Sequence, residues 1–99
     1  MNIKLFISKA GRIILTCDSF FKQRLESVIF DNRTRRIALK FAEDKIPYML
    51  NCEVDDVMAD AMNEKNTCGF GFEKDGKIEH AIFLPLLVAH REIRKGARA

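Results

Sequence analysis

The chain of 99 residues contains no tryptophan, one tyrosine and three cysteines. Cys17, Cys52 and Cys68 are odd in number and form no C-x-x-C pair, so we expect no disulfide framework and infer a reducing, cytoplasmic location. The longest apolar run, 81–89, is far too short to cross a bilayer, and Lys4 interrupts the N-terminal run. We therefore expect neither a secretory signal nor a membrane segment.

The sequence also lacks the patterns that carry catalysis or hold a cofactor. No glycine-rich phosphate loop precedes a helix. His80 and His90 do not stand at metal-ligand spacing, with each other or with a cysteine. A nucleophilic site that uses one of the three cysteines with a histidine is formally possible, but nothing in the sequence indicates an activated thiol. We expect a protein that is not an enzyme, with no catalytic residue, no cofactor and no metal site.

What is present is an ordinary globular composition, with 47% apolar and 31% charged residues. A chain of this length is expected to form a single domain over residues 1–99, in which 91–99 is a basic tail that can fray. The net charge of +3 hides a segregation, because residues 1–50 carry +5, residues 51–90 carry −5 and residues 91–99 carry +3. Either the oppositely charged segments neutralise each other, or the basic half meets a polyanion.

The first two predicted strands, 3–8 and 12–17, flank a tight turn that contains Gly11. Pairing Lys9 with Arg12 in this hairpin puts one set of apolar side chains on each face of the ribbon. One face carries Ile3, Leu5, Ile7, Ile14 and Thr16, and the other carries Phe6, Ile13, Leu15 and Cys17. A ribbon that is apolar on both faces needs cover on both sides, which a second subunit can supply, so we expect a homodimer.

The remaining elements are predicted from alternation, caps and turn residues. A short helix begins at Asp18 or Ser19 and runs through Val28, and a second, opened by Asp55 or Asp56, spans about Asp56–Glu64. A last helix begins at Pro85. Strands are expected at 28–30, 35–41, 48–52, 68–72 and 78–84, with turns at 31–34 and 74–77. The predicted fold class is α+β: a mostly antiparallel sheet of six or seven strands built from hairpins, with two or three short helices.

The run Gly69-Phe70-Gly71-Phe72 is similar to the centre of the first ribonucleoprotein motif of RNA-recognition domains, in which aromatic side chains stack on bases. The flanking residues differ from that motif: Cys68 stands in place of a basic residue, and Glu73 in place of an aliphatic one. A core strand whose glycines admit a neighbouring backbone is the favoured interpretation.

Basic side chains at the two N-terminal turns are the most suggestive candidate site. Lys9 and Arg12 flank the first turn, while Arg33, Arg35 and Arg36 crowd the second. If both turns lie on one edge, their charges can reach the phosphates of duplex DNA. The candidate nucleic-acid-binding set is Lys9, Arg12, Lys22, Arg24, Arg33, Arg35 and Arg36. The competing interpretation is a solvated surface that also blunts edge pairing.

Residues 3–41 resemble the AbrB and MazE type of swapped-hairpin domain. The resemblance rests on the run Gly11-Arg12-Ile13-Ile14-Leu15, a short helix, and a hairpin that ends in residues 35–40, RRIALK. It implies an intertwined dimer that binds DNA through basic residues, with Arg12 the closest positional match. Thr16 stands where that family usually has proline, and residues 42–99 lie outside the resemblance.

Two functions therefore follow from the sequence. The leading one is a small, non-catalytic, DNA-associated regulatory protein that acts as a dimer. The alternative is a protein-binding adaptor or inhibitor that uses sheet edges and the apolar strip from Phe83 to Val88, without nucleic acid. The candidate partner interface is Ile3, Leu5, Ile7, Phe83, Leu84 and Leu86.

Overall fold

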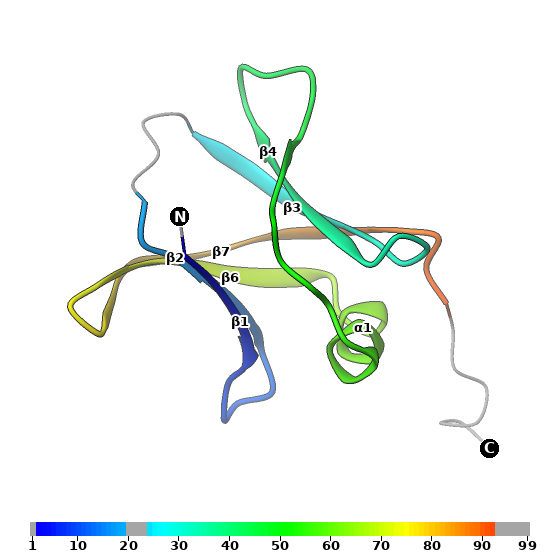
Figure 1. Cartoon of the computed structure of the whole chain (residues 1–99), viewed down its shortest axis with the longest axis horizontal. Coiled ribbons are helices and arrows are strands. Elements are labelled where there is room, and N and C mark those ends of the chain that lie inside the picture. Colours follow the sequence, from blue (N-terminus) through cyan, green and yellow to red (C-terminus); the bar gives the residue numbers. More distant parts are fainter. Residues whose placement is uncertain (1, 20–23, 93–99) are drawn as a thin grey trace.

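Strands dominate the computed structural model, which describes residues 2–19 and 24–92 (Figure 1). They make up about half of the described residues. The elements in chain order are β1 (Ile3–Ile7), β2 (Ile13–Cys17), β3 (Leu25–Asp31), β4 (Arg36–Phe41), β5 (Tyr48–Met49), α1 (Asp56–Asn63), β6 (Thr67–Lys74) and β7 (Lys77–Ala89). Among these residues, α1 is the one helix, and it is too short and too polar to span a bilayer.

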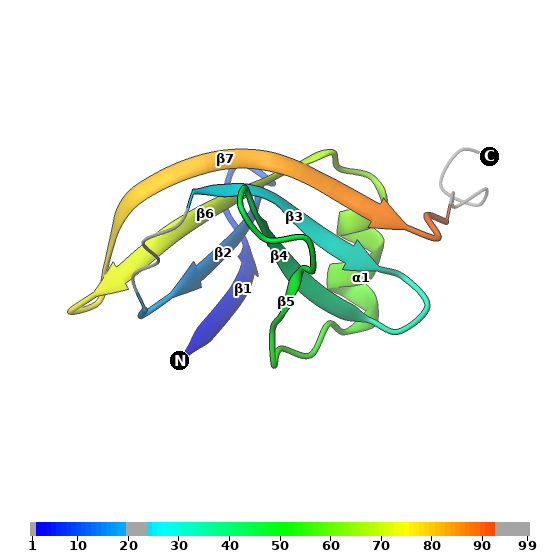
Figure 2. The ribbon, with the colours of Figure 1, turned by 90° about the horizontal axis from the view of Figure 1, so that it is seen from above.

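The seven strands form one curled sheet in the order β1-β2-β6-β7-β3-β4-β5 (Figure 2). β2 pairs with β6 and β3 pairs with β7 in parallel, while the other neighbours are antiparallel. The predicted mostly antiparallel sheet with two or three helices is therefore wrong. Parallel pairing joins segments far apart in the chain, such as Ile14 with Gly69 and Val28 with Leu86. A local sequence pattern does not predict such pairing.

The core lies between one face of the sheet and α1. Alternate side chains of the central strands are fully buried, including Leu15, Val28, Phe30 and Leu39. From α1, Ala59 and Met62 complete this cluster. We call this side of the sheet the core face and the opposite side the outer face.

The register of the first hairpin differs from the prediction by one residue. Ile3 lies opposite Cys17, Leu5 opposite Leu15 and Ile7 opposite Ile13. The connection runs from Ser8 to Arg12, is one residue longer than expected, and contains Gly11 at a φ of 80°. A slip of one residue exchanges the faces of one strand. Most of the apolar side chains therefore gather on the core face, and Phe6 and Ile14 are the apolar pair that remains on the outer face, so the ribbon by itself gives less reason to expect a second subunit.

Neither of two further predicted helices is present in the described residues. Residues 25–28, expected at the end of the first helix, begin β3; residues 20–23 lie outside the described residues. The last predicted helix is replaced by the continuation of β7 through Pro85 to Ala89. Proline is tolerated inside this strand because β7 pairs with β3 only from Leu86 onward, so the missing N–H interrupts no pair of that ladder.

The predicted strand at 48–52 is shorter than expected. β5 contains only Tyr48 and Met49, and Leu50 donates its backbone N–H to Ile37. The chain then runs as a connector, residues 50–55, to the start of α1.

Two local predictions are confirmed. Asp55 caps α1, accepting a hydrogen bond of 2.8 Å from the backbone N–H of Met58, and Asp56 places a second carboxylate in the first turn. The turn between β6 and β7 has Asp75 at a φ of 52° and Gly76 at a φ of 78°, as a two-residue hairpin connection requires.

A buried pair of amides joins α1 to the end of the sheet. Asn63, near the end of α1, donates to the side-chain oxygen of Asn32 (3.0 Å) and to the carbonyl of Ala59 (2.9 Å). Its own side-chain oxygen accepts from the backbone N–H of Glu92 (2.7 Å). The guanidinium of Arg91 donates to the carbonyl oxygen of Asn63. The turn after β3, the end of α1 and the chain after β7 are thus held together.

Candidate functional site

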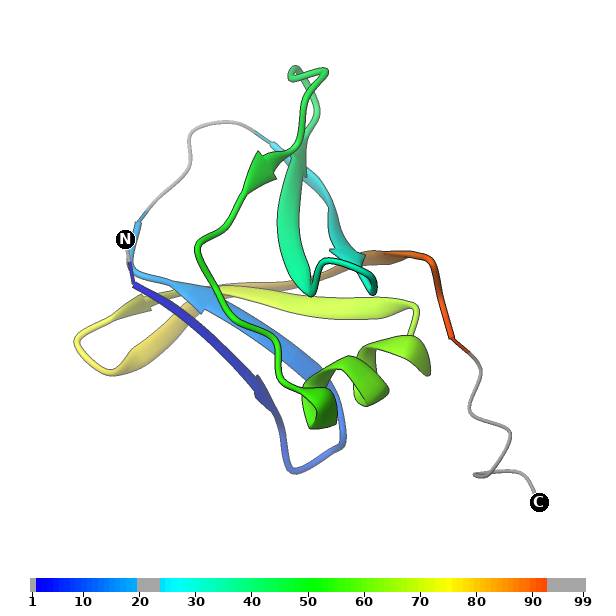
Figure 3. The ribbon, with the colours of Figure 1, turned by 45° about the vertical axis from the view of Figure 1, so that its right-hand side comes forward.

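The two basic turns lie at the same end of the sheet (Figure 3). β2 starts at the first turn and runs parallel to β6, and β7 runs back antiparallel to β6. β3 is parallel to β7, so the second turn, which follows β3, returns to the end where β2 began. We call the two turns tip 1, residues 8–12, and tip 2, residues 31–36.

Tip 1 presents one free and one stacked cation. The backbone N–H of Ser8 donates to the carbonyl of Arg12 (2.8 Å), which closes the loop. The side chain of Lys9 is exposed. The guanidinium of Arg12 lies 4.8 Å from the centre of the Phe83 ring, a cation–π contact on the outer face.

Tip 2 is shaped by Asp31 and by an arginine in left-handed conformation. The carboxylate of Asp31 accepts from the backbone N–H of Arg33 (2.9 Å), and its carbonyl accepts from the N–H of Arg35 (2.8 Å). Arg35 has a φ of 61°. Its guanidinium forms an ion pair of 3.3 Å with Asp56 at the start of α1, whereas Arg33 and Arg36 are exposed.

The other predicted DNA contacts lie elsewhere. Arg24 precedes β3 and therefore lies at the end of the sheet opposite to both tips. Lys22 lies outside the described residues. The structure thus places five of the seven predicted basic residues at one end of the sheet, and of these Arg12 and Arg35 are already engaged by neighbouring groups.

The predicted partner interface divides between the two faces of the sheet. Leu84 and Leu86 are buried in the core, and Ile3 and Leu5 pack against it. Ile7 and Phe83 are exposed. Within the apolar strip, Phe83 and Leu87 lie on the outer face and are each about half exposed. The sequence alone did not distinguish these two residues from their buried neighbours, because the whole strip is apolar.

Ion pairs join the oppositely charged segments of the chain. Lys4 pairs with Glu73 at 2.8 Å, and Arg35 pairs with Asp56. Both pairs link the basic half, 1–50, to the acidic segment, 51–90. Mutual neutralisation therefore accounts for part of the charge segregation, and such exposed pairs contribute little to stability.

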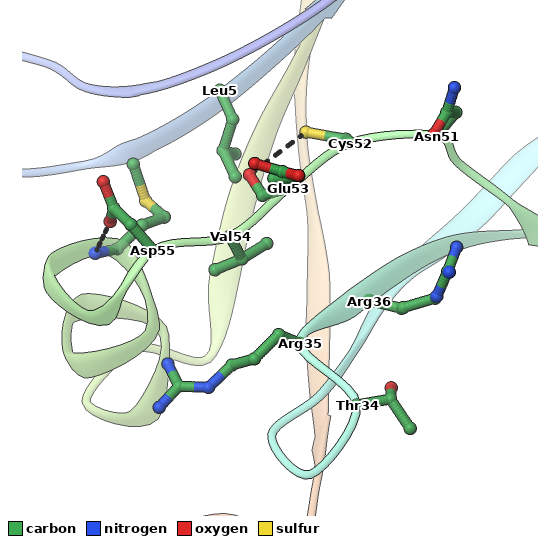
Figure 4. A pocket seen from close by; sticks show the side chains of 10 residues that line it. Leu5, Thr34, Arg35, Arg36, Asn51, Cys52, Glu53, Val54 and Asp55 are labelled. Carbon is green, nitrogen blue, oxygen red and sulfur yellow. Dashed lines mark hydrogen bonds between the residues drawn. The ribbon is translucent and has the colours of Figure 1, made fainter.

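A cavity of about 550 Å³ opens beside tip 2 (Figure 4). The connector between β5 and α1 forms much of its wall, together with tip 2, one residue of β1 and the first turns of α1. The lining residues are Leu5, Thr34, Arg35, Arg36, Asn51, Cys52, Glu53, Val54, Asp55 and Met58. Of these, Arg35 and Arg36 belong to the predicted nucleic-acid-binding set and Leu5 to the predicted partner interface, whereas residues 51 and 52 were expected within a strand.

The thiols are poor nucleophiles. Burial raises the pKa of Cys68 to about 12 from the ordinary 9.0, although a backbone hydrogen bond from Leu15 opposes this. The pKa of Cys52 is raised by burial and then by the charge of Glu53. Burial also raises the pKa of Cys17. Within the described part of the chain, no three histidine, cysteine or acidic side chains gather to hold a metal ion.

These shifts predict slow alkylation at neutral pH. Since a raised pKa lowers the thiolate fraction, iodoacetamide should react with the folded protein only slowly, first at half-buried Cys52, and faster as the pH rises above 9.0. Mass spectrometry of timed samples measures each site. A thiol that is alkylated rapidly, with a pH midpoint below that of a free thiol, would contradict this expectation and revive a cysteine nucleophile.

No family model matches the chain, and neither a curated protein nor a solved structure matches it significantly.

Proposed function

We propose that the protein is a non-catalytic, DNA-associated regulatory protein that contacts duplex phosphates with the basic side chains of tips 1 and 2. The observation that carries the proposal is the presence of both tips at one end of the sheet. The resemblance to swapped-hairpin domains implies the same ligand, but only its glycine–arginine run and its second hairpin have counterparts in the fold, because residues 25–28 belong to β3 and not to a short helix.

The separation of the tips suits a groove of duplex DNA. Between the centre of the β1–β2 pair and the centre of the β3–β4 pair lie four strand spacings of about 4.8 Å, or roughly 19 Å along the sheet. The major groove is about 12 Å wide, so two tips at this spacing can reach phosphates on opposite sides of it.

Three side chains are free to make these contacts. Lys9, Arg33 and Arg36 are exposed, and within the described residues their side chains form no ion pair. Arg12 is held against Phe83, and Arg35 is neutralised by Asp56. Phosphate contacts of this kind supply affinity and orientation without reading the base sequence.

The proposed protein acts as a dimer, and the support for this in the fold is an exposed edge strand rather than a hairpin that is apolar on both faces. β1 is an edge strand of the sheet, and two of its side chains, Phe6 and Ile7, are 38% and 41% exposed. A second copy placed along this edge would cover both. Light scattering over a range of concentrations reports the mass directly.

Reversing charge at tip 2 tests the DNA proposal. Arg33→Glu with Arg36→Glu should weaken binding to a random-sequence duplex at low salt by at least tenfold, because two phosphate contacts become repulsions. Fluorescence anisotropy measures the affinity. The matched control is Arg24→Glu with Lys45→Glu, which makes the same charge change at exposed positions remote from both tips. Equal weakening by the two pairs would show that only net charge matters.

A second candidate function has its own observation. Phe83 and Leu87 are 50% and 53% exposed on the outer face, which α1 does not cover. Exposed apolar patches of this kind mark protein-binding surfaces. A protein partner whose binding survives nuclease treatment and is lost in Phe83→Asp favours this adaptor function over DNA binding.

A further inference from the structure

The cavity beside tip 2 carries one uncommitted charge of each sign. Of its four charged lining residues, Asp55 caps α1 through Met58, and Arg35 turns toward α1 and pairs with Asp56 through one terminal nitrogen, while its other terminal nitrogen is buried without a hydrogen-bond partner (Figure 4). The other two, Arg36 and Glu53, form neither a side-chain hydrogen bond nor an ion pair with any described residue. The cavity therefore has a free cation and a free carboxylate.

The two free charges stand on different sides of the cavity. Figure 4 shows Glu53 beside Leu5, and Arg36 on β4 across the cavity, below Asn51. The wall of the cavity also contains apolar side chains: Leu5 and Met58 are half-buried, and Val54 is 7% exposed. Charges separated in this way do not neutralise each other, as they would in a direct salt bridge.

We propose that this cavity binds a small zwitterion, a molecule with a carboxylate at one end, an ammonium group at the other and a short apolar segment between them. The guanidinium of Arg36 binds the carboxylate, since its fork of N–H donors matches two carboxylate oxygens. Glu53 accepts from the ammonium group, and Val54 with its apolar neighbours contacts the methylene segment. A volume of about 550 Å³ is in the range of small-molecule sites.

The proposal does not depend on DNA binding. It concerns a small molecule, and the connector that supplies Glu53 and Val54 belongs to neither tip. Failure of DNA binding leaves it unaffected, and a ligand bound to Arg36 would compete with phosphate for that one side chain.

Calorimetric titration of the full chain with four probes tests the proposal: 6-aminohexanoate, hexanoate, hexylamine and hexanol. The zwitterion should bind about tenfold or more tightly than either singly charged probe, since each charged end adds a charge-assisted hydrogen bond. Hexanol should bind most weakly. Zwitterion affinity no better than that of hexanol would overturn the proposal.

Two substitutions assign the ends of the ligand. Arg36→Gln should weaken 6-aminohexanoate and hexanoate by about tenfold and leave hexylamine unchanged, whereas Glu53→Gln should weaken 6-aminohexanoate and hexylamine and leave hexanoate unchanged. Both side chains are exposed, so the variants are expected to fold, which circular dichroism checks. Arg24→Gln, remote from the cavity, is the control and should retain the affinity for every probe. Wild-type affinities in both cavity variants would refute the assignment.

Discussion

Asn63→Ala is expected to lower the free energy of unfolding by about 3 kcal/mol, or the melting temperature by roughly 15 °C. The side chain is 8% exposed and makes three hydrogen bonds, to Asn32, Ala59 and Glu92. Its removal leaves the buried oxygen of Asn32 without this donor, and an unsatisfied buried group costs more than the lost bond itself. Thermal unfolding followed by circular dichroism measures the effect.

The control is Asn66→Ala, three residues along the chain. The side chain of Asn66 is exposed, and only its backbone carbonyl is used, accepting from the N–H of Leu86. This change should shift stability by less than about 0.5 kcal/mol. Equal losses in the two variants would mean that the amide pair does not hold α1 to the sheet.

A pair of phenylalanine substitutions contrasts the two faces of the sheet. Phe30→Ala should cost about 4 kcal/mol, because the ring is fully buried on the core face and its loss leaves a cavity. Phe83→Ala should cost less than about 1 kcal/mol, because that ring is half exposed on the outer face, where it lies over Gly69 and contacts the guanidinium of Arg12. Urea denaturation of each variant gives the comparison.

The same two variants also test whether a second copy of the chain covers the outer face. If Phe83→Ala were as destabilising as Phe30→Ala, and its effect grew with protein concentration, the outer face would be buried against a second copy. Similar, concentration-independent losses would instead contradict the assignment of the two faces.

Local signals predicted local structure. Asp55 followed by an apolar stripe identified α1, and Asp75-Gly76 identified the turn between β6 and β7, because caps and turns depend on neighbouring residues. Longer-range features were not predictable in this way. The apolar residues of the segment 18–28 have helical spacing, yet its last residue, Val28, lies within β3 and pairs with Leu39 on one side and Leu86 on the other.

One extra residue in the turn determines the register of the first hairpin. The apolar residues of β1 and β2 suit two registers equally well, and only the length of the turn around Gly11 selects between them. The two registers give opposite conclusions about which side chains face the core. Turn geometry was therefore the missing information, not hydrophobicity.

The candidate site was predictable in part. The crowding of Arg33, Arg35 and Arg36 at one turn was visible in the sequence, but their shared end with tip 1 depends on the two parallel strand pairs. The ion pair of Arg35 with Asp56 also requires the fold, because α1 comes from a different part of the chain. Glu53 carried no signal, since an isolated carboxylate in a polar stretch is typical of any solvated loop.

The salt dependence of duplex binding tests the proposed DNA contact most directly. With Lys9, Arg33 and Arg36 as the phosphate contacts, the logarithm of the binding constant should fall linearly with the logarithm of salt concentration, with a slope of about −3. Removing Arg33 and Arg36 should bring the slope close to −1. Absence of binding at low salt, or a slope that these substitutions leave unchanged, would contradict the proposal that the two tips together contact DNA.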